Sequence, residues 1–121
     1  EGMAMKLAVN AMFGIQIAAF AEVLGMLTKN GLELEKAIQC LSHLPVTSPA
    51  VKNAANLILK DNHAAMFPIY LVEKDFRYVM QTAADIEAKV PTSEAIHQVY
   101  LDAVDKGYGS DNITGVVKLF I

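Results

Sequence analysis

The feature that most constrains this fold is a long apolar stretch at the start of the chain. Residues 3–29 contain no proline, and Asn30 and Gly31 then supply the left-handed stop that commonly ends a helix. Fifteen uncharged residues separate Lys6 from Glu22. At about 100° per residue, the few polar side chains scatter around the helix axis and form no continuous polar face. Because a helix of this kind is buried on most sides, we expect it to be the central helix of the domain.

The composition and charge exclude several classes of protein. With 121 residues, of which 54% are hydrophobic, the chain can bury one core and is not a disordered tail. Ten Lys and Arg against 13 Asp and Glu argue against a nucleic-acid or anionic-membrane partner. The uncharged run is also shorter than the roughly 20 apolar residues of a membrane span. The single cysteine, Cys40, excludes an internal disulfide.

The rest of the chain predicts five shorter helices and no strand. We expect these helices at residues 32–44, 49–60, 70–88, 91–106 and 111–120, with a loop at 61–67. Phe76 and Ile86 are among the residues expected to face inward. On the long first helix, small residues at spacings of three or four predict a close contact with another helix: Gly14, Ala18, Ala21 and Gly25. The predicted fold class is all-α, a single domain of about six helices around a largely buried first helix.

Two polar side chains near the start of the first helix form the first candidate site. Lys6 and Asn10 are four residues apart, so they share one helix face with Cβ atoms roughly 6 Å apart. A partly buried lysine amine is suited to general acid–base work near neutral pH. A lysine in the first turns of a helix also extends readily to water. The spacing alone leaves both interpretations open.

A second constellation lies where the helix at 70–88 is expected to begin. Phe67 and Pro68 end the preceding loop, and Lys74 and Asp75 follow in the first turns, where a carboxylate gains from the helix dipole. Taken alone, Lys74 and Asp75 also fit a solvated charge pair, and Phe67 fits a core residue. No metal site is expected, since the three histidines lack the spacing of metal ligands: His43, His63 and His97.

Together these residues resemble the β-hydroxyacid dehydrogenases, the family of 3-hydroxyisobutyrate dehydrogenase and the glyoxylate/succinic semialdehyde reductases. Residues 2–10 are similar to the family's Gly-x-x-x-Lys-x-x-x-Asn pattern. Phe67-Pro68 followed by Lys74-Asp75 resembles its second pattern, Phe-Pro-Leu and then Lys-Asp. Residues 107–114, with Asp111, resemble its closing Gly-x-x-x-Asp stretch. The three patterns occur in the family's order over essentially the whole chain.

The resemblance implies a division of labour between two domains. In the family an N-terminal Rossmann domain binds NAD or NADP, and an all-helical C-terminal domain, like that of 6-phosphogluconate dehydrogenase, completes the active site. Residues 1–121 resemble only the helical domain. By resemblance, Lys6 is the catalytic acid/base, and Lys74 reaches the cofactor. The substrate, a small hydroxy acid or semialdehyde, is bound by Asn10, Phe67 and Asp75.

The resemblance also implies a homodimer in which this domain takes part in the interface. No Gly-x-Gly-x-x-Gly pattern is present, so we expect the 121-residue chain to be inactive by itself. A chain that begins with Glu1 and enters a helix at once is expected to be a piece of a longer protein. We expect a cytoplasmic protein. The alternative hypothesis, suggested by the stripe of small residues, is a non-enzymatic helical module that self-associates.

Overall fold

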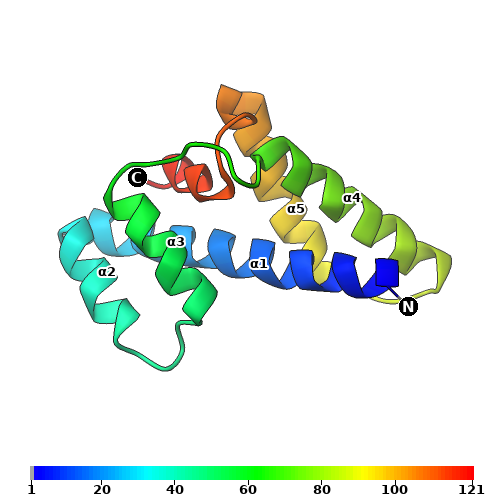
Figure 1. The fold of residues 1–121 in the computed structure, drawn as a ribbon, viewed down its shortest axis with the longest axis horizontal. Coiled ribbons are helices and arrows are strands. Elements are labelled where there is room, and N and C mark those ends of the chain that lie inside the picture. The colour runs from blue at the N-terminus through cyan, green and yellow to red at the C-terminus, as the bar shows by residue number, and fades with distance from the viewer. Residues whose placement is uncertain (1) are drawn as a thin grey trace.

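The first helix, α1 (Gly2–Lys29), runs along most of the molecule's longest axis, and the other elements pack against it (Figure 1). A computed structural model describes residues 2–121. Glu1, on which the expectation of a longer parent protein rests, lies outside the described residues. The other elements are α2 (Leu34–Ser42), α3 (Pro49–Leu59), α4 (Ile69–Asp85), α5 (Pro91–Ala103), η1 (Val104–Tyr108) and η2 (Ile113–Leu119). Residues 2–121 contain helices and no named strand, so the predicted all-α class is confirmed.

Helix ends follow the predicted signals with two exceptions. Gly31 adopts the left-handed backbone that ends α1, with φ of 97°, and the Ser48 hydroxyl caps α3 by accepting a hydrogen bond from the Val51 N–H. The helix predicted at 91–106 is instead divided into α5 and η1, and the chain turns at Gly107, inside η1, with φ of 91°. Helix α4 ends at Asp85, so Ile86 is exposed and the prediction that it faces inward is wrong.

Burial along α1 is uneven. Its buried residues all lie from Gly14 onward, whereas Met5 and Met12 are 65% and 62% exposed. The expectation of a largely buried helix is therefore right for the core-facing side of the C-terminal half. It is wrong for the N-terminal half and for the face opposite the core, because the other helices cover α1 from one side. By length and composition α1 could cross a membrane, which the count of uncharged residues did not predict.

The predicted stripe of small residues makes close contacts within the chain. A Cβ atom added at Gly14 would lie 2.6 Å from Cε2 of Phe76 in α4, and one at Gly25 would lie 2.6 Å from Cβ of Phe120. The Phe76 ring stacks on Tyr100 of α5, whose hydroxyl donates a hydrogen bond of 2.6 Å to the Gly14 carbonyl. Burial raises the pKa of Tyr100 well above its usual range. Helices α1, α4 and α5 are therefore locked together at this crossing.

Candidate active site

A groove opens between the first turns of α1 and the outer face of α4. Its volume is about 420 Å³. Its lining comes from these two helices alone: Met3, Lys6, Leu7, Asn10, Asp75, Tyr78, Gln81 and Thr82. Three of the five residues predicted from the sequence, namely Lys6, Asn10 and Asp75, thus share one site. The groove forms because α1 and α4 meet at the Gly14–Phe76 contact, one helical turn beyond Asn10.

The centre of the groove is a hydrogen bond between its two walls. Asn10 Nδ2 donates to Asp75 Oδ2 at 3.0 Å, joining residues that are 65 positions apart. Both side chains are half-buried. A primary amide has a second N–H and a carbonyl oxygen, so Asn10 can hold a ligand while it stays bonded to Asp75. The carboxylate therefore fixes the orientation of the amide.

Lys6 lies on the same side of α1, one turn before Asn10. Its side chain is exposed, so the expected partial burial of this lysine is not found in this chain. Within residues 2–121 it takes part in no salt bridge. The groove thus presents an ammonium group next to an oriented amide. This pairing can bind a carbonyl or hydroxyl oxygen and exchange a proton with it.

The other two predicted residues lie outside the groove. Lys74 is exposed on α4, with Nζ 5.7 Å from the ring centroid of Tyr78, a residue of the groove wall. Phe67 lines a separate cavity of about 300 Å³, formed with residues that include Phe13 and Asn112. Its backbone N–H donates to Asn112 Oδ1 at 2.9 Å, which holds the start of α4 against η2. The structure does not bring Phe67 to Lys6.

Sequence reasoning missed the polar residues that extend the groove along α4. Tyr78 and Thr82 lie three and seven residues after Asp75 and therefore share its helix face. Gln81 lines the same wall. The helical spacing from Asp75 was the available signal, but without the α1–α4 contact nothing distinguished this face from an ordinary solvent-exposed one.

A buried carboxylate holds the α4 wall of the groove in place from behind. Glu73 of α4 accepts hydrogen bonds at its Oε2 from Arg77 Nε at 2.7 Å and from His97 Nε2 of α5 at 2.8 Å. Burial by itself raises the pKa of Glu73, but the hydrogen bonds from His97 and Arg77 outweigh it and the pKa is lowered overall. This carboxylate fastens α4 to α5, so it supports the groove without lining it.

The closing stretch of the family pattern plays a structural part in this chain. Asp111 pairs with Lys118 at 2.8 Å, and this hydrogen bond raises the pKa of Lys118. The Asp111 carbonyl accepts a hydrogen bond of 2.9 Å from the Ile69 N–H, which ties the stretch to the first turn of α4. In the part of the chain that the structure describes, no three His, Cys, Asp or Glu side chains gather closely enough to hold a metal ion.

The fold and the groove define a helical domain, and its sequence matches a family model of dehydrogenases. A family model described as "NAD-binding of NADP-dependent 3-hydroxyisobutyrate dehydrogenase" matches residues 1–120. The chain therefore belongs to the 3-hydroxyisobutyrate dehydrogenase family, which includes oxidoreductases that use NAD or NADP. The resemblance noted from the three sequence patterns is confirmed.

Three relatives illustrate the range of this family. L-threonate dehydrogenase of Cupriavidus necator is 26% identical over 119 residues, which are 98% of this chain and 40% of that protein. The chloroplastic glyoxylate/succinic semialdehyde reductase 2 of Arabidopsis thaliana is 26% identical over 98% of this chain and 33% of its own length. The cytokine-like nuclear factor N-PAC of Aedes aegypti is 26% identical over 93% of this chain and 20% of its own length. The chain thus spans at most two fifths of these relatives.

Solved structures share the fold. The 3-hydroxyisobutyrate dehydrogenase of Salmonella typhimurium superposes with a TM-score of 0.92 at 22% identity, covering 98% of this chain and 42% of that one. The Mycobacterium tuberculosis 3-hydroxyisobutyrate dehydrogenase, solved with L-serine, gives a TM-score of 0.84 at 18% identity over 98% and 43% of the two chains. These similarities establish the helical architecture.

Proposed function

We propose that this chain is the C-terminal catalytic and dimerisation domain of an NAD(P)-dependent β-hydroxyacid dehydrogenase. The observation that carries the proposal is the groove in which Lys6, Asn10 and Asp75 meet. Its volume of about 420 Å³ falls in the range of roughly 300–1,000 Å³ typical of small-molecule sites. The proposed substrate is a small hydroxy acid or semialdehyde, of the kind that appears in the names of the relatives.

The groove is the proposed site of the substrate and of the reactive end of the dinucleotide only. The sequence has no glycine-rich turn between a strand and a helix that would cradle a pyrophosphate, so another domain is proposed to hold most of the NAD or NADP. Lys74, exposed beside the groove wall, is this chain's own proposed contact to the cofactor, because a lysine ammonium suits phosphate oxygens. When bound, the nicotinamide supplies or accepts the hydride.

Lys6 is the proposed acid/base. When the substrate carbonyl is reduced, negative charge builds on its oxygen, and the Lys6 ammonium can stabilise that charge and donate a proton from Nζ. In the oxidative direction neutral Nζ accepts the proton of the substrate hydroxyl. Asn10 holds the substrate oxygen close to Nζ, and Asp75 lines the groove and orients Asn10. The substrate contact proposed for Phe67 rests on the resemblance alone, because its side chain lines the second cavity.

The remaining parts of the proposal concern the environment of the domain. We infer a cytoplasmic homodimer that has no dehydrogenase activity without a cofactor-binding domain. Neither nucleic acid nor a membrane is a proposed partner, since the formal net charge is −3. The alternative, a non-enzymatic self-associating module, is favoured by the match to a protein named as a nuclear factor. Its original motivation is weaker, because Gly14 and Gly25 contact residues of the same chain.

Replacing Lys6 distinguishes the dehydrogenase proposal from the self-associating module. Lys6→Ala, made in the full-length enzyme that contains this chain, should lower kcat by at least about 100-fold, because the proton donor is lost. Lys29→Ala, an exposed lysine at the other end of α1, is the matched control and should leave kcat unchanged. Unchanged turnover in Lys6→Ala would remove this residue from the mechanism. Circular dichroism of both variants checks that α1 is intact.

A further inference from the structure

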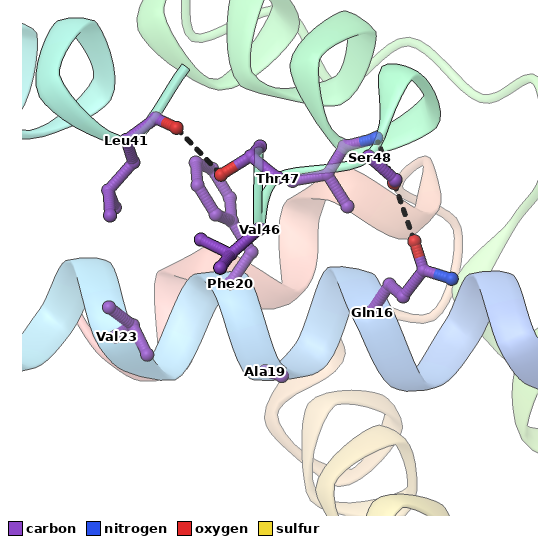
Figure 2. Close-up of a pocket in the computed structure, with 9 residues that line it drawn as sticks. Gln16, Ala19, Phe20, Val23, Leu41, Val46, Thr47 and Ser48 are labelled. Carbon is purple, nitrogen blue, oxygen red and sulfur yellow. Dashed lines mark hydrogen bonds between the residues drawn. The ribbon is translucent and has the colours of Figure 1, made fainter. Parts of the chain in front are cut away.

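The cavity between α1 and the loop before α3 carries no charged side chain. Its volume is about 440 Å³, and none of the nine residues that line it is an acid or a base (Figure 2). The Ser48 hydroxyl donates a hydrogen bond of 2.6 Å to Gln16 Oε1, and the Thr47 hydroxyl donates one of 2.7 Å to the Leu41 carbonyl. Because phosphate groups are bound most strongly by cationic donors, this cavity is not suited to a dinucleotide.

Lys74, beside the groove, differs because its charge is not neutralised. Its side chain is exposed, and within residues 2–121 it forms no salt bridge. Its Nζ lies 5.7 Å from the ring centroid of Tyr78, within the roughly 6 Å over which an aromatic face attracts a cation. This attraction acts on the charge of the ammonium and leaves its three N–H donors free. Lys74 can therefore contact the ring and still donate hydrogen bonds to an anion.

The neighbours of Lys74 on α4 direct its ammonium toward the groove. At 100° per residue, Arg77 lies about 60° to one side of Lys74, and Tyr78 lies about 40° to the other side. The Arg77 guanidinium is held by its hydrogen bond of 2.7 Å to Glu73, and like charges this close on a helix repel each other. Tyr78 lines the groove. The repulsion from Arg77 and the attraction of the ring thus act in the same direction.

We propose that Tyr78 is a positioning residue, whose ring holds the Lys74 ammonium beside the groove so that it meets a phosphate oxygen of the cofactor. This inference rests on the proposed function, in which Lys74 is the chain's own contact to NAD or NADP. An exposed lysine otherwise samples many rotamers, and fixing one of them on binding costs free energy. A ring contact that forms before binding reduces this cost. At an exposed site such a contact accounts for an effect of about two- to fivefold on the dissociation constant.

The ring, rather than the hydroxyl group, is the part of Tyr78 that this role requires. The Tyr78 side chain is 51% exposed, so its hydroxyl can stay in water while the face of the ring contacts the ammonium. Phenylalanine presents the same face, whereas leucine has a similar hydrophobic character but no ring. Tyr78→Phe and Tyr78→Leu therefore separate the effect of the ring from that of the hydroxyl group.

The contact itself is measurable in the 121-residue chain without a cofactor. An aromatic ring shifts the NMR signals of protons held over its face upfield, so the ε-methylene protons of Lys74 should be shifted in the unaltered chain. The shift should persist in Tyr78→Phe and disappear in Tyr78→Leu. Circular dichroism checks that the variants keep their helices. A Lys74 signal that is the same in all three proteins would overturn the proposal.

The effect on the cofactor is measured in the full-length enzyme that contains this chain, by titration with NADH and with NADPH. Tyr78→Leu should raise the dissociation constant of the cofactor about two- to fivefold, whereas Tyr78→Phe should leave it unchanged. Tyr70→Leu is the matched control, at a tyrosine that is 52% exposed and lies four residues before Lys74, and it should also leave the constant unchanged. An equal effect on both dinucleotides would assign Lys74 to the pyrophosphate, and an effect on NADPH alone would assign it to the 2′-phosphate.

A double-mutant cycle distinguishes positioning from a direct contact between the ring and the cofactor. Lys74→Ala should raise the dissociation constant by more than Tyr78→Leu does, because the phosphate contact itself is lost. When Lys74→Ala is already present, Tyr78→Leu should have no further effect. An equal effect of Tyr78→Leu with and without Lys74 would overturn the proposal, because the ring would then act independently of the lysine.

The inference and the proposed function fail in different ways. A full-length enzyme that binds neither NADH nor NADPH would overturn the proposed function, and with it the role of Lys74. An enzyme that binds its cofactor equally well as Tyr78→Leu and as the unaltered protein would overturn the inference about Tyr78 alone.

Discussion

The two halves of α1 have similar apolar sequences but different surroundings. From Gly14 to Gly25 the helix contributes buried residues to the core, and two of its glycines lie within van der Waals contact of phenylalanine side chains. Before Gly14 the same helix is mostly exposed and forms one wall of the groove with Lys6 and Asn10. Hydrophobicity therefore marks surfaces that need a partner, whereas the position of the other helices decides which surfaces receive one.

The largest loss of stability is expected from a substitution in the C-terminal half of α1, where the helix is most tightly packed. Gly25→Leu would place a side chain against Phe120, whose Cβ lies 2.6 Å and whose backbone oxygen lies 2.9 Å from the added Cβ. Since backbone cannot move aside cheaply, we expect a loss of about 3 kcal/mol or more in the free energy of unfolding. Urea unfolding followed by circular dichroism measures the loss. An equally stable variant would show that α1 and the C-terminal residues are less tightly packed than the structure shows.

A smaller effect should come from the buried carboxylate behind the groove. Glu73→Gln replaces the ionised partner of Arg77 and His97, which should cost about 1–3 kcal/mol. In the folded chain, the hydrogen bonds from His97 and Arg77 hold the pKa of Glu73 below its ordinary value of 4.5. The ionised carboxylate therefore stabilises the fold above pH 4.5, and that contribution is lost as the pH falls through the folded-state pKa.

Unfolding curves recorded over a series of pH values test whether Glu73 causes this loss of stability at low pH. The unaltered chain should lose more stability than Glu73→Gln as the pH falls below 4.5. Parallel curves for the two proteins would show that Glu73 is not the group responsible. Asp85→Asn, on an exposed position at the end of the same helix, is a matched control and should behave like the unaltered chain.

Substitutions in the groove beside the N-terminal half of α1 should lower activity rather than stability. Asp75→Ala removes the acceptor that orients Asn10, and in the full-length enzyme we expect kcat/KM to fall about tenfold. Tyr78→Phe, on the same wall, keeps the ring but loses the hydroxyl and should change kcat/KM less. Steady-state kinetics of the three proteins give the comparison. If Asp75→Ala matched the unaltered enzyme, the Asn10–Asp75 bond would have no part in substrate binding.

The smallest effect is expected on the exposed side of the N-terminal half. Ala8→Leu adds the same side chain as Gly25→Leu, but at an exposed position of α1. Surface substitutions of this kind change the free energy of unfolding by less than about 0.5 kcal/mol. The urea experiment used for Gly25→Leu measures it. A loss comparable to that of Gly25→Leu would remove the contrast between the two halves of the helix.

Much of the fold and part of the site were accessible from the sequence. Proline and glycine positions, with the Ser48 cap, located the helices to within a few residues, because these residues act on the backbone locally. The Lys6–Asn10 pair was predictable from helix geometry alone. The approach of Asp75 was expected only from the family resemblance, and the placement of Phe67 in a second cavity was not foreseen, since it depends on the bond between its backbone and Asn112.

The all-α class, the ends of most helices and the family of the chain follow from the amino-acid sequence alone. All of these depend on residues that are close together in the sequence or on sequence patterns that can be compared between proteins. Which apolar faces are covered and which residues line the groove depends on the packing of the helices in three dimensions. The physical reason is that burial and long-range contacts depend on how separate helices cross. The Gly14–Phe76 contact sets one such crossing, and the opposite face of α1 is left open by the same arrangement.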